Sequence, residues 1–191
     1  IKRLKEKNVR VVSDIEAAYM VTDAPIVSIT GTNGKTTNTA LVGEIVKESK
    51  KSCKVTGNIG FGMFYDAVSS HKGDILVAEV SSFQLAGTSE YKPHISIITN
   101  ITPDHLDYHH TMENYVEAKF KNVVNQDESD YAILNYEDEI IMNFSSKIRA
   151  KKIFFSSERI LDEGICVEDG KMIFKSKGKP EFIINVKDIF I

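Results

Sequence analysis

Cysteine is scarce in this chain: only Cys53 and Cys166 occur among its 191 residues. The two lie far apart and outside any Cys-x-x-Cys pair, which argues against a disulfide framework and against a cysteine-ligated metal site. We expect both to be small, buried apolar side chains.

Long hydrophobic runs and a strong charge of one sign are also missing. No apolar run approaches the length of a membrane-spanning helix, and no charged, apolar and small-residue succession marks a signal peptide. We therefore expect a cytoplasmic protein without membrane insertion. The formal net charge of -3 gives no electrostatic reason for a nucleic-acid partner. With 42% hydrophobic and 27% charged residues, the composition is that of an ordinary globular protein.

The two ends of the chain suggest a piece of a longer protein. It begins at Ile1 rather than at methionine and stops in the strand-like stretch "VKDIFI". We interpret residues 1–21 as the tail of a preceding domain with a linker. Within this tail, "VRVV" is expected to be a short strand, and a capping box from Ser13 to Glu16 predicts the start of a helix.

Residues 22–191 alternate apolar runs of strand length with helical patterns. This succession predicts βαβ units, and so an α/β fold with a mainly parallel sheet covered by helices. The expected strands are "PIVSIT", "CKVTGN", "DILVAEV", "HISIITN", "YAILNY" and "KKIFFSS", and the expected helices are 36–49, "SFQLAGT", 111–125 and 138–145. Near the C-terminus, Asp169-Gly170 between alternating stretches predicts antiparallel strands at the sheet edge.

The stretch "SITGTNGKTT", residues 28–37, is similar to a phosphate-binding loop without its first glycine, because Ile29 occupies that position. Phosphate binding requires a strand, a tight turn with accessible backbone N–H groups and a helix N-terminus, and this stretch supplies all three. Lys35 would reach the β- and γ-phosphates, and the Thr36 hydroxyl would hold Mg²⁺. A bare glycine-rich turn is the alternative. The flanking strand and helix favour a nucleotide site of P-loop NTPase type.

Carboxylates and histidines follow the next strands of the predicted sheet. Glu79 ends the run "DILVAE". The stretch "NITPDHLDYHH" brings Asp104, His105, Asp107, His109 and His110. Each taken alone also fits a helix cap, a turn or a surface loop. Because parallel strands place their carboxyl ends at one ligand-binding edge, several such groups beside a phosphate loop favour a metal-nucleotide site. His71 and His94 lie outside this edge and are expected to be structural.

Five stretches occur in the order and approximate spacing of the Mur ligase family. They are "GTNGKTT" (31–37), "GNIG" (57–60), "EVSSFQL" (79–85), "NITPDHLDYH" (100–109) and "YVEAKFKN" (115–122). The resemblance covers nearly the whole chain: residues 1–21 resemble the end of the family's UDP-binding domain, and residues 22–191 resemble its central ATP-binding domain. The family's C-terminal domain has no counterpart here. "EVSSFQL" is most similar to the family member that adds D-glutamate, since the ligase adding the third residue carries a histidine where Phe83 stands.

The resemblance implies an ATP-dependent amide ligase of peptidoglycan synthesis. Its substrates would be UDP-N-acetylmuramoyl-L-alanine and D-glutamate, joined through an acyl phosphate, and the full-length protein is expected to be a monomer. Asn58, Ser81 and His105 match positions near the muramoyl substrate or the metals. The ATP phosphate loop is matched by Gly31, Thr32, Asn33, Gly34, Lys35, Thr36 and Thr37.

The resemblance also assigns metal and catalytic roles. Thr36, Glu79, His105 and the modified Lys119 would hold Mg²⁺, of which the site would take one or two ions. Lys35, His105 and Lys119 would be catalytic. Lys119 matches a lysine that the family carries as a carbamate, an anion close to magnesium. From the residues alone, Lys119 on a helix would simply be a solvent-facing lysine.

Two rival functions remain open. Folylpolyglutamate synthases of the same superfamily carry a loop like "GTNGKGS", so Thr36-Thr37 and "SSFQL" argue against that activity. A P-loop nucleotide-binding module without ligase activity would have no use for the histidine-rich loop. Substrate-dependent phosphate release would separate a ligase from such a module.

Overall fold

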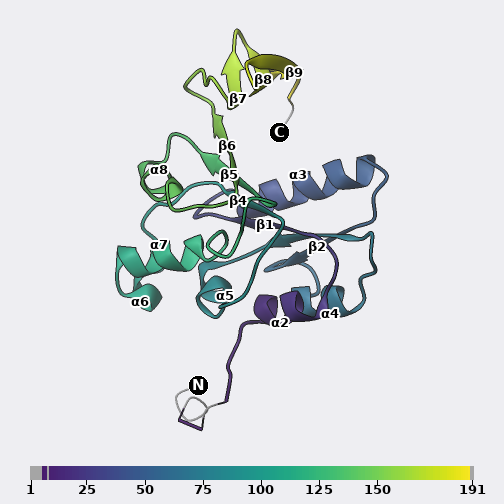
Figure 1. Cartoon of the computed structure of the whole chain (residues 1–191), viewed down its shortest axis with the longest axis vertical. Helices are drawn as coiled ribbons and strands as arrows, with labels where there is room; N and C mark the ends of the chain where they lie inside the picture. Colours follow the sequence, from purple (N-terminus) through teal and green to yellow (C-terminus); the bar gives the residue numbers. More distant parts are fainter. Residues whose placement is uncertain (1–5, 8, 190–191) are drawn as a thin grey trace.

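A single mixed sheet organises the chain (Figure 1). The computed structural model describes residues 6, 7 and 9–189. The sheet has nine strands in the order β2-β3-β1-β4-β5-β6-β7-β8-β9. Neighbours up to β7 are parallel, while β8 pairs antiparallel with both β7 and β9. The predicted α/β fold and its antiparallel C-terminal strands are therefore confirmed.

The elements follow the predicted alternation closely. The strands are β1 Ile26–Thr30, β2 Cys53–Gly57, β3 Ile75–Glu79, β4 Ile95–Ile98, β5 Tyr131–Asn135, β6 Lys151–Ser156, β7 Gly164–Glu168, β8 Lys171–Ser176 and β9 Lys179–Asn185. The helices are α2 Asp14–Val21, α3 Lys35–Glu48, α4 Met63–Val68, α5 Ser82–Ala86, α6 Leu106–His109, α7 Met112–Phe120 and α8 Glu139–Ser145, with a 3-10 turn at Val186–Asp188. The hairpin turn lies at Asp169 and Gly170, whose φ angles of 49° and 70° suit the twist of a tight hairpin.

The central strands bury both of their faces. Ile26 of β1 and Leu76 of β3 pack in one core with residues of α2, α4 and α5. Val27 and Val77, their neighbours along the chain, point the other way and pack beneath α3. Figure 1 shows α3 on one side of the sheet and α2, α4 and α5 on the other. This double coverage explains why these strands are nearly continuous apolar runs.

Two predicted elements differ from the structure. Residues 9–12, "VRVV", form no strand. Their backbone is instead anchored through the Arg10 guanidinium, which binds the Glu16 and Glu90 carboxylates. The predicted helix 111–125 ends at Phe120. Beyond Lys121 the helical ladder shortens, because the Asn122 and Val123 N–H groups donate to the Lys119 and Phe120 carbonyls, only three residues back.

The helix α2 shares a core with the elements that follow it. Ile15 and Ala18 are fully buried in the same cluster as Ile26. Ser13 caps α2 as predicted, by accepting from the Glu16 N–H. The Glu16 carboxylate does not complete the capping box, because it accepts from the Ser89 hydroxyl and from two backbone N–H groups of the same loop. The division between residues 1–21 and 22–191 stays a prediction.

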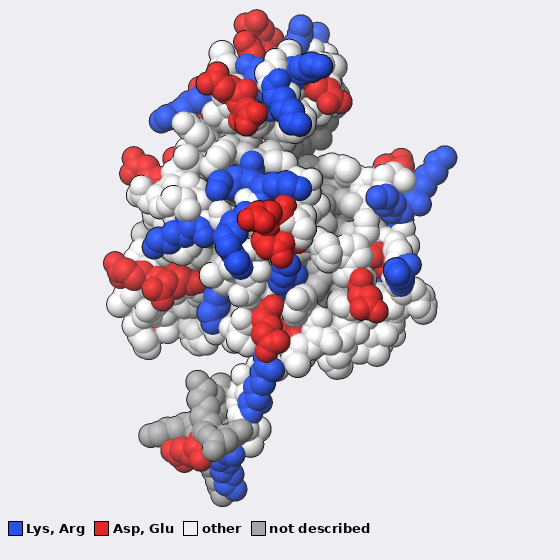
Figure 2. All heavy atoms as spheres, in the orientation of Figure 1, with Lys and Arg blue, Asp and Glu red and all other residues white. Residues whose placement is uncertain are grey.

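The surface carries charges of both signs. In Figure 2, Lys and Arg side chains and Asp and Glu side chains are scattered over the visible face, with uncharged areas between them. Cys166 is buried and Cys53 is half-buried, and both are free thiols. Within residues 6, 7 and 9–189, no helix has the length and apolar character needed to cross a membrane.

Candidate active site

The loops after β1, β3 and β4 open at one edge of the sheet. Because β3 and β4 flank β1 in parallel register, the carboxyl ends of all three strands meet there. A small cavity of about 150 Å³ lies at this edge. It is lined by Lys35, Asn58, Ser81, Ser82, Phe83, His105, Tyr115 and Lys119. Five of these residues were predicted from the sequence: Lys35, Asn58, Ser81, His105 and Lys119.

The glycines of the phosphate loop are required by its geometry. A Cβ at Gly31 would lie 1.9 Å from the Thr99 hydroxyl, and Gly34 has a φ of 79° where α3 begins. The first intrahelical hydrogen bond of α3 runs from the Asn38 N–H to the Gly34 carbonyl. The N–H groups of residues 35–37 therefore have no partner within the helix, and they suit an anion. The shortened loop thus keeps the feature that phosphate binding needs.

The middle of the loop is tied to the segment after β4. The Thr32 and Asn33 N–H groups donate to the backbone carbonyl and the side-chain carbonyl of Asn100, at 2.8 and 2.9 Å. The Lys35 ammonium curls back and donates to the Gly31 and Thr32 carbonyls, at 3.0 and 2.9 Å. In this conformation, the N–H groups at the N-terminus of α3 are available to bind a phosphate, whereas those of Thr32 and Asn33 are already hydrogen-bonded to Asn100. The phosphate contacts of these two residues stay a prediction.

Glu79 is a buried carboxylate with an unused oxygen. It is 2% exposed at the end of β3, where its Oε1 accepts from the Asn58 amide at 3.0 Å. Its Oε2 is buried without a hydrogen-bond partner among the described residues. A buried acceptor left in this way costs about 1–3 kcal/mol, and a bound cation would satisfy it. The position of Glu79 therefore fits a metal ligand.

The donor set around Glu79 fits magnesium better than zinc. The described part of the chain contains no cluster of three or more His, Cys, Asp or Glu residues able to hold a metal ion. Mg²⁺ is commonly bound by one or two carboxylates, with waters and substrate phosphates completing its coordination. Glu79 beside a phosphate loop supplies that arrangement.

His105 projects into the cavity from a constrained turn. Its φ of 52° is left-handed, and its N–H donates to the Asp104 carboxylate at 2.9 Å. The imidazole Nε2 lies 3.4 Å from the other Asp104 oxygen, and the ring centroid lies 4.8 Å from that of Phe83. Asp104 and Phe83 together orient the imidazole. Asp107 and His110 are exposed, as are His71 and His94, which lie outside this edge as expected.

Lys119 is buried, contrary to its simplest interpretation from the sequence. Only 2% of it is exposed, because α7 turns this face toward the phosphate loop instead of toward water. Its Nζ donates to the Gly31 carbonyl at 2.7 Å and lies 4.8 Å from the centre of the Tyr115 ring. Burial, and then the charge of Lys35, lowers the pKa of Lys119 to about 7. A large share of this amine is therefore neutral near pH 7.

Two further groups support the site: sequence analysis missed Tyr115, and it named His109 only among the groups that favour a metal-nucleotide site. Tyr115 lies one helical turn before Lys119, and its hydroxyl is 3.0 Å from the Thr32 hydroxyl. Helical spacing from Lys119 was the available signal. His109 is buried, with its Nε2 3.0 Å from the Ser82 hydroxyl. Burial, and then the charge of His105, lowers the pKa of His109.

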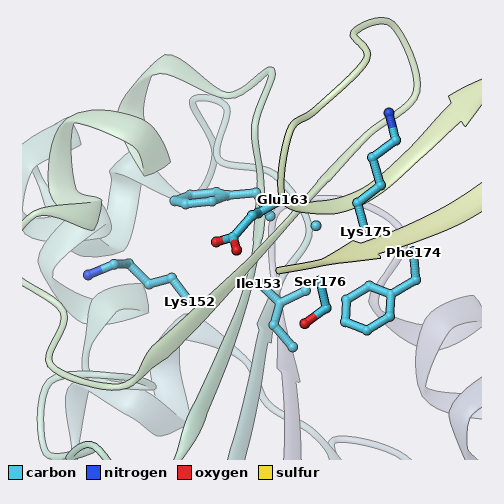
Figure 3. Close-up of a pocket in the computed structure, with 8 residues that line it drawn as sticks. Lys152, Ile153, Glu163, Phe174, Lys175 and Ser176 are labelled. Atoms are coloured by element: carbon cyan, nitrogen blue, oxygen red, sulfur yellow. The ribbon is translucent and has the colours of Figure 1, made fainter. Parts of the chain in front are cut away.

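A larger cavity lies away from this edge. It measures about 320 Å³ and lies between β6 and the β7-β8 hairpin, where Lys152, Glu163 and Lys175 border it (Figure 3). In Figure 3, the two ammonium groups point in different directions and do not converge on one point. Lys175 is also paired with Glu168 at 2.9 Å. This cavity shares no residue with the site at the strand ends, so its size does not make it the functional site.

Burial of Lys119 predicts a pH-dependent stability. The native pKa of about 7 lies below the ordinary value of 10.5, so between these values the unfolded chain binds more protons and stability rises with pH. The loss of stability caused by burying Lys119 is fully present below pH 7. We expect the free energy of unfolding to gain about 2 kcal/mol from Lys119 between about pH 7 and about pH 9. Urea titrations in CO₂-free buffer measure this gain. The variant Lys119→Met should lack it, and equal pH dependence of the two proteins would contradict the burial.

Comparison with known proteins agrees with this geometry. Residues 29–186 match the family described as Mur ligase middle domain. The chain is 44% identical over 191 residues to the UDP-N-acetylmuramoylalanine--D-glutamate ligase of Alkaliphilus oremlandii, and 42% identical to that of Thermoanaerobacter pseudethanolicus. These alignments cover 100% of this chain and 42% of each relative.

A solved structure shares the fold. The MurF ligase from Thermotoga maritima in complex with ADP superimposes with a TM-score of 0.62 at 20% identity, over 89% of this chain and 42% of that one. The chain belongs to the Mur ligase family, whose middle domain it contains. It spans less than half the length of the curated relatives that it matches.

Proposed function

We propose that this chain is the ATP-binding centre of a ligase that joins D-glutamate to UDP-N-acetylmuramoyl-L-alanine. The observation that carries the proposal is the cavity where Lys35, His105 and Lys119 meet beside the buried Glu79 carboxylate. The 44% identity to a protein of that name supports the choice of substrates. The stretch "EVSSFQL", which resembles the same member of the family, is part of this similarity.

The reaction proceeds through an acyl phosphate. The carboxylate of the muramoyl substrate attacks the γ-phosphorus of ATP, an O–P bond forms, and ADP leaves. The amine of D-glutamate then attacks the acyl carbon and releases one proton. A C–N bond forms, the C–O bond to the phosphate breaks, and phosphate leaves with the bonding electrons. Lys35 lies where it offsets the charge of the transferred phosphoryl group, and the N-terminus of α3 holds the phosphates. No side chain of the chain acts as a nucleophile in the ligation itself.

Glu79, Thr36 and His105 would hold one or two magnesium ions. Magnesium would supply charge neutralisation at the phosphate oxygens. Glu79 offers its partnerless Oε2, Thr36 its exposed hydroxyl at the first turn of α3, and His105 its imidazole at the cavity wall. Asn58 holds the other oxygen of Glu79 and so fixes the carboxylate.

Lys119 is proposed to act as its carbamate. Its neutral amine attacks the carbon of CO₂, an N–C bond forms, and one proton is released. The lowered pKa of Lys119 supports this step, since only the neutral amine reacts. The product is an anion next to the Lys35 ammonium, which suits a place beside magnesium. The cytoplasmic location and the monomeric state of the whole protein also stay predictions.

The deciding assay uses the protein extended to the length of its curated relatives. We expect phosphate release that requires Mg-ATP, UDP-N-acetylmuramoyl-L-alanine and D-glutamate together, with an amide product. Phosphate release without the two acceptors would favour a plain NTPase module, and dependence on a folate and glutamate would favour the folylpolyglutamate alternative. The 191-residue chain should unfold cooperatively but form no product, because misplacing substrates by about 1 Å already costs about 10²-fold in rate.

A further inference from the structure

Three hydrogen-bonded side chains connect α2 to the cavity. The Gln84 amide nitrogen lies 3.1 and 3.0 Å from the two carboxylate oxygens of Asp14, on the first turn of α2. The carbonyl oxygen of the same amide accepts from the backbone N–H and from the hydroxyl of Ser81, both at 3.0 Å. Ser81 lines the cavity. This series of hydrogen bonds therefore runs from the surface of α2 to the cavity.

The chemistry of these groups fixes the direction of each hydrogen bond. An ionised carboxylate only accepts, so Gln84 has to turn its NH₂ toward Asp14 and its carbonyl toward Ser81. An amide carbonyl also only accepts, so the Ser81 hydroxyl donates its single hydrogen to it. The Ser81 oxygen in addition accepts the Gln84 N–H, at 3.3 Å. One lone pair of this oxygen remains for the cavity.

We propose that Asp14 and Gln84 are positioning residues that make Ser81 a hydrogen-bond acceptor toward the ligand. Ser81 then selects a donor group: an N–H or O–H of the muramoyl substrate, or a water bound to the metal. The identity of these ligands rests on the proposed function. The direction of the hydrogen bonds is a property of the protein alone, and it is testable without any ligand.

The role of Asp14 is separate from the anchoring of α5. The Ser13 N–H donates to the Gly87 carbonyl at 3.1 Å. The Lys121 ammonium donates to the Ala86 and Thr88 carbonyls, each at 2.9 Å. These bonds hold the end of α5 without Asp14. Removing the Asp14 carboxylate therefore leaves the Gln84 amide held by Ser81 alone, while the helix stays in place.

Hydrogen exchange tests this series of hydrogen bonds in the absence of ligand. In Asp14→Ala, we expect the backbone N–H of Ser81 to exchange about fivefold faster, because the Gln84 carbonyl is no longer held against it. The control is Asp23→Ala, which removes an exposed carboxylate beyond the other end of α2 and should leave this rate unchanged. Equal exchange of Ser81 in Asp14→Ala and in the natural protein would overturn the proposal.

Exchanging the carboxylate of Asp14 with the amide of Gln84 tests whether these hydrogen bonds affect the reaction. The experiment uses the protein extended to the length of its relatives. Gln84→Glu places two carboxylates next to each other. We expect the half-saturating concentration of either the muramoyl substrate or Mg²⁺ to rise about fivefold or more. In the double variant Asp14→Asn with Gln84→Glu, the new amide donates to the new carboxylate, which still accepts from Ser81. This variant should return to within about twofold of the natural protein. A double variant as impaired as Gln84→Glu would overturn the proposal.

The kinetic constant that changes identifies the donor. A higher KM for the muramoyl substrate assigns the donor to the substrate, and a higher half-saturating Mg²⁺ concentration assigns it to a metal-bound water. A kcat that falls without a change in either constant would contradict an acceptor role for Ser81. If the natural protein itself shows no ligase turnover, the proposed function fails, and the exchange of Ser81 still decides the positioning role.

Discussion

Lys35→Ala is expected to abolish measurable binding of Mg-ATP to the chain and to lower ligase turnover of the extended protein about 10²- to 10³-fold. The ammonium of Lys35 is the cation that the loop places at the N-terminus of α3, and it holds the Gly31 and Thr32 carbonyls at 3.0 and 2.9 Å. A phosphate bound at the helix N-terminus would replace these two carbonyls as the partner of the Lys35 ammonium. Alanine leaves the phosphate without that charge, while the glycines of the loop keep their geometry.

The matched control for Lys35→Ala lies on the same helix. Lys47→Ala removes a lysine at the far end of α3, whose partner is the exposed Glu44. An exposed pair of this kind contributes little to stability, and it lies far from the loop. Calorimetric titration should show unchanged affinity in Lys47→Ala. Equal affinity in Lys35→Ala and in the natural protein would refute the nucleotide site.

Glu79→Gln is expected to change activity and stability in opposite directions. Turnover of the extended protein should fall at least about tenfold, which corresponds to about 1.4 kcal/mol of transition-state stabilisation, because an amide binds Mg²⁺ less well than a carboxylate. The metal-free fold should keep or gain about 1 kcal/mol, since the substitution removes a buried charge whose Oε2 has no described partner. The amide oxygen can still accept from Asn58.

Two measurements separate the effects of Glu79→Gln. Urea unfolding without metal gives the stability, and turnover against Mg²⁺ concentration gives the role in metal binding. Asp104→Asn is a useful comparison, because the Asp104 carboxylate lies on the same edge but is half-exposed and bound to His105. Normal activity and normal Mg²⁺ dependence of Glu79→Gln would show that Glu79 is not a metal ligand.

The local parts of the site were accessible from the sequence. Apolar runs predicted every strand that carries a site residue, and the glycine pattern predicted the turn before α3. The burial of Glu79 and Lys119 depends on contacts with residues that are distant in the sequence. Glu79 is buried because β3 pairs directly with β1, and Lys119 is buried because α7 packs over the phosphate loop. No pattern within "YVEAKFKN" encodes that packing. The absence of a strand in "VRVV" has the same origin, since β-propensity forms no strand without a partner edge.

The Gly31 carbonyl accepts hydrogen bonds from both lysines of the site. This shared acceptor has a consequence for the entropy of ligand binding. Immobilising a lysine side chain costs up to about 2 kcal/mol of rotamer freedom. In this protein, the two side chains are already held before any anion arrives, so most of that cost falls on folding. An incoming phosphate therefore meets a Lys35 ammonium that is already ordered, and its affinity is less reduced by side-chain ordering than at a site built from free surface lysines.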